Sequence, residues 1–421
     1  MMASPALQAE PPAVWPRWLP FSLLPIFLAI LSRPAVDALF DFNFVKYLYM
    51  FAIFFGVLLA RVGMSMAAPD PGRAEDERRA LMVLAMTLVY FWYLIVLTLS
   101  RSGSLQDIFK LISPFLFFGL MLLVTGRWLI VAAAAASVMI IVVNACLLPT
   151  GFGWTTWGDA HTFKGFYFFK TDLAYALCFA VLTVAFAQRY RFTALVAVLA
   201  IAAAAQVVLS NSRLNYLSFA LVIAFIALKG GFRASTIIRT SILGTGVAGA
   251  FWILYDPAKV LTFDLSDTHA FTQGRDVVWD VLIEQGLFKY GPMEWMFGGG
   301  MFADAEIYAA NTSGGLVHNA HNEFLHLLIT QGIAGFLIYL TLWVSVLRAA
   351  RPRSAPRWTR GTSEMAVIIF LLQSVTTTVA LFAQKTWPLA IALLLVRTSA
   401  LADRTISASV GDCGAHSIQN R

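Results

Sequence analysis

Long apolar segments separated by short polar ones dominate this chain. A helix needs about 20 apolar residues to cross a bilayer, and on that measure the sequence contains about twelve candidate spans. Backbone polar groups inside a bilayer must be hydrogen-bonded within the protein, which favours helices. We therefore expect an all-α polytopic membrane protein. The expected spans are Pro16–Leu31, Phe44–Ala60, Leu81–Leu99, Ile108–Val124, Trp128–Leu148, Leu173–Ala187, Phe192–Leu209, Tyr216–Leu228, Ile237–Tyr255, Phe324–Leu347, Met365–Leu381 and Trp387–Leu401.

The composition supports this interpretation. Hydrophobic residues make up 59% of the chain and charged residues 13%, whereas a soluble domain carries roughly 25% charged residues. The net charge of +7 fits basic loops beside lipid headgroups, so we expect membrane lipids and no nucleic acid as partners. Cys146, Cys178 and Cys413 form no CxxC motif or disulfide framework, which argues against redox chemistry.

The basic residues also predict the side on which each loop lies. With about twelve spans and a cytoplasmic N-terminus, most of the 30 Lys and Arg residues fall on the cytoplasmic side. Both termini are then cytoplasmic, and the first span is expected to be a retained anchor rather than a cleaved signal peptide. Residues 1–255 are expected to form the first nine spans, 256–321 one long outer loop, 322–404 the last three spans and 405–421 a cytoplasmic tail.

The long outer loop is expected to be folded. It contains a predicted amphipathic helix, Val277–Leu287, and a glycine-rich bend at residues 298–300. A loop of this length is usually functional or disordered. Its aromatic residues, among them Trp279 and Trp295, favour packing on the membrane surface over disorder. A shorter outer loop covers Pro149–Thr171.

Two histidines lie where the long loop meets the next apolar segment. His318 and His321 are three residues apart, so in a helix they share a face with Asn322 and Leu325. Neutral imidazole accepts a proton near neutral pH, which makes His321 a candidate general base beside His318 and Asn322. One alternative is a histidine bonded to a backbone carbonyl. Another is a zinc site that includes His326, although the HExxH spacing is missing.

Three basic residues lie on the expected outer side, against the overall charge gradient. Lys170, Arg213 and Arg275 each stand at the start of a predicted helix. The helix dipole does not stabilise a cation there. Guanidinium groups bind phosphate oxygens with two parallel hydrogen bonds and stay charged, so the three residues could hold a diphosphate without a metal. The alternative is that they anchor the chain at lipid headgroups.

Taken in order along the chain, these motifs resemble the bacterial O-antigen ligase/polymerase superfamily. The resemblance extends from about Thr162 to Leu347. The residues that carry it are His318–Leu325 with the following Gln331–Gly335, Ser212–Arg213, Gly274–Arg275 with Trp279, and Phe169–Lys170. The chain departs from the family pattern in two places. Thr171 or Asp172 replaces the usual Asn, and Thr330–Gln331 replaces an acidic residue before Gly-x-x-Gly.

The resemblance implies a C-type, metal-independent, inverting glycosyltransferase of the bacterial inner membrane, without a cofactor and with its active site facing the periplasm. The donor would be a glycan on undecaprenyl diphosphate, and for a ligase the acceptor would be a sugar of the lipid A–core oligosaccharide. His321 would be the general base, and Arg213 and Arg275 would stabilise the leaving diphosphate. Lys170, His318 and Asn322 would bind substrate.

Three other functions remain open at the level of the sequence. An O-antigen polymerase or a protein O-oligosaccharyltransferase would use the same donor, although the 421-residue length and the moderate outer loop favour the ligase. A transporter or flippase would place charged residues deep within its spans. Most charges here lie at span ends and in loops, with Lys46 and Asp172 as the candidates for deeper positions.

Overall fold

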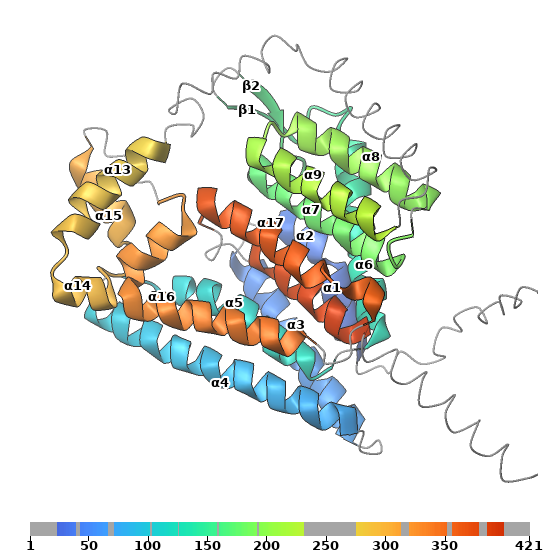
Figure 1. The fold of residues 1–421 in the computed structure, drawn as a ribbon, viewed down its shortest axis with the longest axis horizontal. Coiled ribbons are helices and arrows are strands. Elements are labelled where there is room, and N and C mark those ends of the chain that lie inside the picture. The colour runs from blue at the N-terminus through green and yellow to red at the C-terminus, as the bar shows by residue number, and fades with distance from the viewer. Residues whose placement is uncertain are drawn as a thin grey trace, which may run out of the picture.

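A computed structural model describes residues 23–38, 43–65, 71–101, 103–124, 126–157, 160–191, 193–230, 275–312, 320–351, 356–378 and 385–399, and these are mostly helical (Figure 1). The first helices are α1 (Leu24–Leu31), α2 (Arg33–Ala38), α3 (Asn43–Ser65), α4 (Pro71–Ser100), α5 (Leu105–Leu122) and α6 (Arg127–Leu147). After strands β1 (Trp154–Trp157) and β2 (Ala160–Phe163) follow α7 (Lys170–Ala187), α8 (Ala194–Leu209) and α9 (Arg213–Lys229). The remaining elements are α13 (Arg275–Gln285), η2 (Leu287–Lys289), α14 (Pro292–Phe297), α15 (Ala303–Asn311), α16 (Glu323–Ala350), η3 (Arg357–Thr359), α17 (Thr362–Thr376) and a last helix over 385–399.

Within the described ranges, five helices are long and apolar enough to cross a membrane. They are α4 from Ala74, α5, α6, α7 and α16. Each expected span that falls within the described residues overlaps a helix, whereas Ile237–Tyr255 lies outside them. The chain is therefore a helical protein with membrane-spanning character, as its apolar segments predict.

Burial separates central helices from peripheral ones. The most apolar stretch of α7 is 83% buried and that of α5 is 72% buried, against 33% for α4. Aromatic side chains fill the space around α5: Phe117 stacks on Trp387 at 4.6 Å, and Phe115 meets Trp343 edge-on at 4.9 Å. Helices α5 and α7 therefore form the centre of the bundle, and α4 lies at its edge.

The segment expected as a short loop, Pro149–Thr171, contains the only departure from an all-α fold among the described residues. Strands β1 and β2 pair antiparallel, with Trp154 opposite Phe163 and Thr156 opposite His161. Threonine and aromatic side chains favour the extended backbone of a strand. The described residues thus fit an all-α protein that carries one short two-stranded hairpin, which the sequence did not predict.

Helix α16 is two helices that meet at Gly332. This residue has φ 65° and ψ −172°, a backbone conformation open essentially to glycine alone. The glycine-rich bend lies against the break: the Gly299 N–H donates to the Ile329 carbonyl at 2.8 Å and the Gly300 N–H to the Thr330 carbonyl at 3.1 Å. The expected span Phe324–Leu347 lies within α16, but it is not one straight helix, because the kink at Gly332 divides it into two helical parts.

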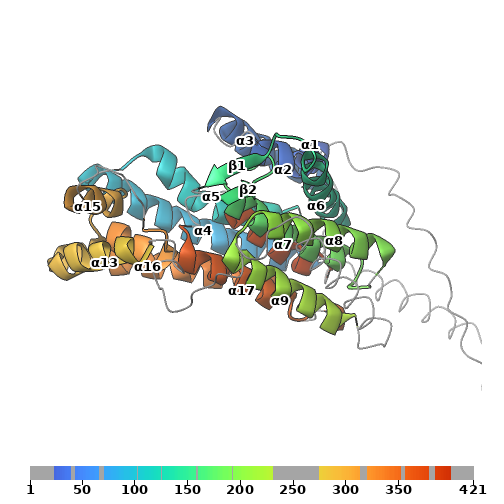
Figure 2. The same cartoon turned by 90° about the horizontal axis from the view of Figure 1, so that it is seen from above.

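That first half of α16 belongs to a small folded unit, here called the loop unit, made of residues 275–312 and 320–331. Figures 1 and 2 show its helices α13 and α15 together at one end of the molecule. The loop unit has its own apolar core, formed by Val278, Leu282, Leu287, Ala303, Ala320, Leu325 and Ile329. Residues 275–312 form short helices, as expected, while 256–274 lies outside the described ranges and the extent of the outer loop stays a prediction.

Candidate active site

Lys170 and Arg213 stand at the first positions of two helices that pack side by side, α7 and α9. The amide nitrogen of Asn215 joins these helix starts. It donates to the Ser212 hydroxyl at 2.9 Å and to the Thr171 carbonyl at 3.3 Å. The sequence prediction that both cations begin helices is confirmed, and the two lie at the same end of the bundle.

Arg275 begins α13 in the loop unit. The positive charges of Arg213 and Arg275 both act on the ammonium group of Lys170. All three side chains are half-buried. Partial burial lowers the pKa of the Arg275 guanidinium from its ordinary value, because the charged form loses contact with water. These three residues, hereafter the cationic cluster, are brought together from three separate helices.

His321 lies in the turn that leads into α16 and is half-buried. Its backbone is left-handed, with φ 48°. The indole N–H of Trp279 donates to the carbonyl of Ala320 at 2.7 Å, which ties this turn to α13. Trp279 is one helical turn beyond Arg275, so both stand on the same side of α13. The helix that carries one member of the cationic cluster therefore also holds the segment of His321.

Asn322 caps the helix that follows His321. Its side-chain oxygen accepts hydrogen bonds from the backbone N–H groups of Phe324 at 3.0 Å and Leu325 at 3.1 Å. The helix begins at Glu323, so His321 lies before it. The expectation that His321 shares a helix face with Leu325 is therefore wrong. His318 lies outside the described residues. Substrate binding by Asn322 stays a prediction.

A buried acid–histidine pair supports the turn of His321, and the sequence did not predict it. Asp304 in α15 accepts a hydrogen bond from the Ala320 N–H at 3.0 Å and contacts His326 Nδ1 at 2.8 Å. Both side chains are 1% exposed. Burial opposes ionisation of Asp304, but the charge of His326 and the hydrogen bonds from His326 and from backbone N–H groups outweigh it and hold the pKa of Asp304 below its usual range. His326, a zinc ligand in one alternative, is thus bound to a carboxylate.

Two further buried ion pairs lie at helix ends. Lys385 Nζ is 3.1 Å from Asp172 Oδ1, and both side chains are almost fully buried. Arg397 pairs with Asp76 in the same way. Asp172, one of the residues considered for a transport path, is therefore neutralised beside the start of α7.

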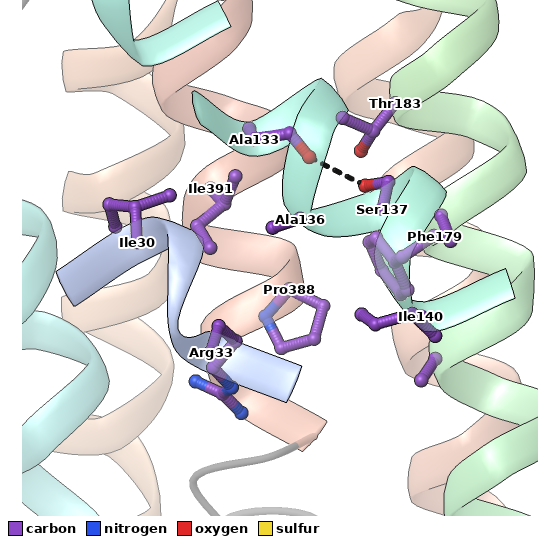
Figure 3. Close-up of a pocket in the computed structure, with 12 residues that line it drawn as sticks. Ile30, Arg33, Ala133, Ala136, Ser137, Ile140, Phe179, Thr183, Pro388 and Ile391 are labelled. Atoms are coloured by element: carbon purple, nitrogen blue, oxygen red, sulfur yellow. Dashed lines mark hydrogen bonds between the residues drawn. The ribbon is translucent and has the colours of Figure 1, made fainter. Parts of the chain in front are cut away.

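A cavity in the bundle lies apart from these residues (Figure 3). Its lining is mostly apolar and comes from α1, α2, α6, α7 and the helix over 385–399. The lining residues are Ile30, Arg33, Ala133, Ala136, Ser137, Ile140, Ala176, Phe179, Ala180, Thr183, Pro388 and Ile391. The Arg33 guanidinium lies over the Trp387 ring, 5.0 Å from its centre. This cavity shares no residue with the cationic cluster or with the turn of His321.

No protein-family model matches the chain, and no curated protein matches it. Among the residues that the structure describes, no three His, Cys, Asp or Glu side chains are grouped as a metal site would require. The features that bear on function are three cations that begin three helices and a histidine whose turn is hydrogen-bonded to one of those helices.

Proposed function

We propose that the chain is an O-antigen ligase. It transfers a glycan from undecaprenyl diphosphate to a sugar hydroxyl of the lipid A–core oligosaccharide. The enzyme would lie in the bacterial inner membrane as a multi-pass protein of about twelve spans, with both termini in the cytoplasm. Its active site would face the periplasm.

The observation that carries the proposal is the gathering of Lys170, Arg213 and Arg275, with the turn of His321 tied to the helix of Arg275. A diphosphate is the polyanion of the lipid-linked donor, and three cations in a half-buried setting suit it. Guanidinium groups bind phosphate oxygens bidentately and remain charged throughout the reaction. The neighbouring apolar helices provide surface for the polyprenyl chain.

The proposed reaction is a single displacement. His321 accepts the proton of the acceptor hydroxyl, whose oxygen attacks the anomeric carbon of the donor glycan. The bond from that carbon to the diphosphate oxygen breaks, and undecaprenyl diphosphate leaves with the electron pair. A positioned base contributes about 10²–10⁴-fold to such a rate. Stabilisation of the growing negative charge by the cationic cluster is commonly the larger contribution.

Two related activities would use the same chemistry, namely O-antigen polymerisation and transfer to protein hydroxyls. Transport or flipping of the lipid is a more distant function. It is disfavoured because the buried charges seen in Asp172–Lys385 and Asp76–Arg397 are paired near helix ends.

Lipopolysaccharide from a strain that lacks the gene tests the proposal. A ligase predicts loss of all long-chain species from the lipid A–core, with accumulation of polymer on undecaprenyl diphosphate. Plasmid-borne wild-type chain should restore the long-chain species. A single repeat left on the core would indicate a polymerase instead. Unchanged lipopolysaccharide with loss of protein glycosylation would indicate an oligosaccharyltransferase.

A further inference from the structure

The residue before His321 is held through both of its backbone polar groups. The Ala320 N–H donates to Asp304 at 3.0 Å, and the Ala320 carbonyl accepts from Trp279 at 2.7 Å. The side chain of Ala320 is itself fully buried in the core of the loop unit.

His321 needs such support because of its own backbone. A left-handed conformation at a residue other than glycine is uncommon, and it persists when the surroundings over-determine it. On the C-terminal side, Asn322 fixes the start of α16 through its side-chain cap. On the N-terminal side, Asp304 and Trp279 supply the fixed points. The backbone of His321 is therefore held on both sides by its neighbours.

Asp304 is in turn held by His326, which contacts the same carboxylate oxygen that accepts the Ala320 N–H. His326 lies in the first half of α16, one turn beyond the segment that Asp304 fixes. Both side chains are almost fully buried, so neither is placed to touch a substrate. The pair connects α15, the turn and α16 around one oxygen atom.

We propose that Asp304 is the positioning residue for His321, acting through the Ala320 N–H and kept in place by His326. The inference rests on the proposed function, in which His321 is the general base. Asp304 does not exchange a proton with the acceptor; it fixes the distance and direction of the imidazole relative to the acceptor hydroxyl. Its loss should therefore lower the rate of the chemical step while donor binding is kept.

A double-mutant cycle on the purified full-length protein tests this inference. Asp304→Asn and Asp304→Ala are each made with His321 intact and together with His321→Ala. The readouts are kcat for glycan transfer and KM for the lipid-linked donor. Glu306→Gln is the matched control, because Glu306 lies on the same helix and is exposed. Asp304→Asn keeps an oxygen of the right size but loses the negative charge. It therefore still tests the inference if the alanine variant does not fold.

With His321 intact, kcat should fall about 10-fold for Asp304→Asn and about 100-fold for Asp304→Ala, which does not exceed the 10²–10⁴-fold that a positioned base contributes. KM for the donor should change by less than about threefold. In the His321→Ala background, neither substitution should lower the residual rate further, because the two residues act as one unit. Glu306→Gln should behave like the wild type.

Either folded Asp304 variant transferring at the wild-type rate would overturn the inference. An equal loss in both backgrounds would overturn it as well, since that is what general destabilisation produces. If His321→Ala alone transfers at the wild-type rate, the proposed base and this inference both fail. If His321→Ala is inactive and only the Asp304 prediction fails, the proposed function stands without this positioning residue.

Discussion

Lys170, Arg213 and Arg275 occupy first positions of helices, where the helix dipole adds to the repulsion among them. Each is also half-buried, and for Arg275 the loss of contact with water lowers the pKa of the guanidinium from its ordinary value. Cations that lie close together repel one another, and a bound polyanion lowers that repulsion. Perturbed charges of this kind are typical of functional sites, and a diphosphate is an anion of suitable charge for this one.

Replacement of either arginine by lysine should weaken handling of the donor. In Arg213→Lys and Arg275→Lys the charge is kept but the bidentate geometry is lost. We expect kcat/KM for the lipid-linked donor to fall about tenfold in each, which corresponds to about 1.4 kcal/mol. Arg101→Lys is the matched control, because Arg101 is exposed and pairs with Glu294 at 3.2 Å. Full activity with lysine at both positions would mean that bulk positive charge suffices.

The stability of the loop unit should depend on the ionisation of Asp304. Its folded-state pKa lies below the ordinary value, so the carboxylate stabilises the folded state above the unfolded pKa of about 3.9. That contribution is lost as the pH falls through the lower folded-state pKa. The thermal unfolding midpoint should therefore drop more in the wild type than in Asp304→Asn when the pH is lowered from about 6 to about 3. Equal drops would contradict a stabilising charge on Asp304.

The sequence predicted those features of the candidate site that depend on residue type and on where helices begin. Lys170, Arg213 and Arg275 could be singled out because they are cations at predicted helix starts that run against the charge gradient expected from the sequence, and their role stays a prediction. Asp304 was missed because its role depends on a contact with Ala320, sixteen residues away, and on burial. Neither property has a local signal in the sequence.

The break in α16 is the feature that shapes the candidate site at the scale of elements. Gly332 lets residues 323–331 turn away from the second half of the helix and join the loop unit. A β-carbon on Gly332 would lie 2.5 Å from the nitrogen of Gly298 and 2.6 Å from the Met296 carbonyl oxygen. Backbone atoms cannot move aside as a flexible side chain would. The break thus couples the glycine-rich bend to the helix that follows His321.

Gly332→Ala should destabilise the protein and slow transfer. The backbone conformation alone costs about 1–3 kcal/mol for a residue with a β-carbon, and the contacts with the glycine-rich bend add to this. We expect a lower thermal unfolding midpoint in detergent and a reduced transfer rate. Gly151→Ala serves as the control, because a β-carbon there meets nothing within 4 Å. Equal midpoints for the two variants would contradict the account of the break.

Element positions in the bundle were predictable because apolar length alone determines a spanning helix. The hairpin of β1 and β2 was missed, since four-residue strands have too few positions for a clear alternation. The break at Gly332 was missed for a different reason. The apolar run from Phe324 to Leu347 is compatible with one helix, and only the contact with the glycine-rich bend shows that the backbone turns there.

The whole molecule combines a helical bundle with a loop unit at one end (Figure 1). The cationic cluster draws on both parts, because Lys170 and Arg213 belong to the bundle and Arg275 to the loop unit. The distribution of basic residues predicts that this end faces the periplasm. This orientation is a prediction, and it determines which compartment supplies the acceptor.

Labelling of single cysteines in cells tests the orientation. Phe288 in the loop unit is 75% exposed, and Arg360, beyond η3, is exposed. With Cys146 and Cys413 replaced by serine, Phe288→Cys should react with a membrane-impermeant maleimide in spheroplasts, whereas Arg360→Cys should react only after permeabilisation. Cys178 is buried and serves as the background signal. The reverse pattern would place the loop unit in the cytoplasm.

The most direct measurement compares glycan transfer by the purified wild-type chain and by His321→Ala in proteoliposomes. The substrates are undecaprenyl-diphosphate-linked glycan and lipid A–core. The wild type should form the glycosylated core, and His321→Ala should be slower by about 10²–10⁴-fold. Its insertion into the bilayer and its thermal unfolding midpoint should be unchanged. Transfer by His321→Ala at the wild-type rate would contradict the role of His321, and a wild-type chain that forms no product would contradict the proposed function.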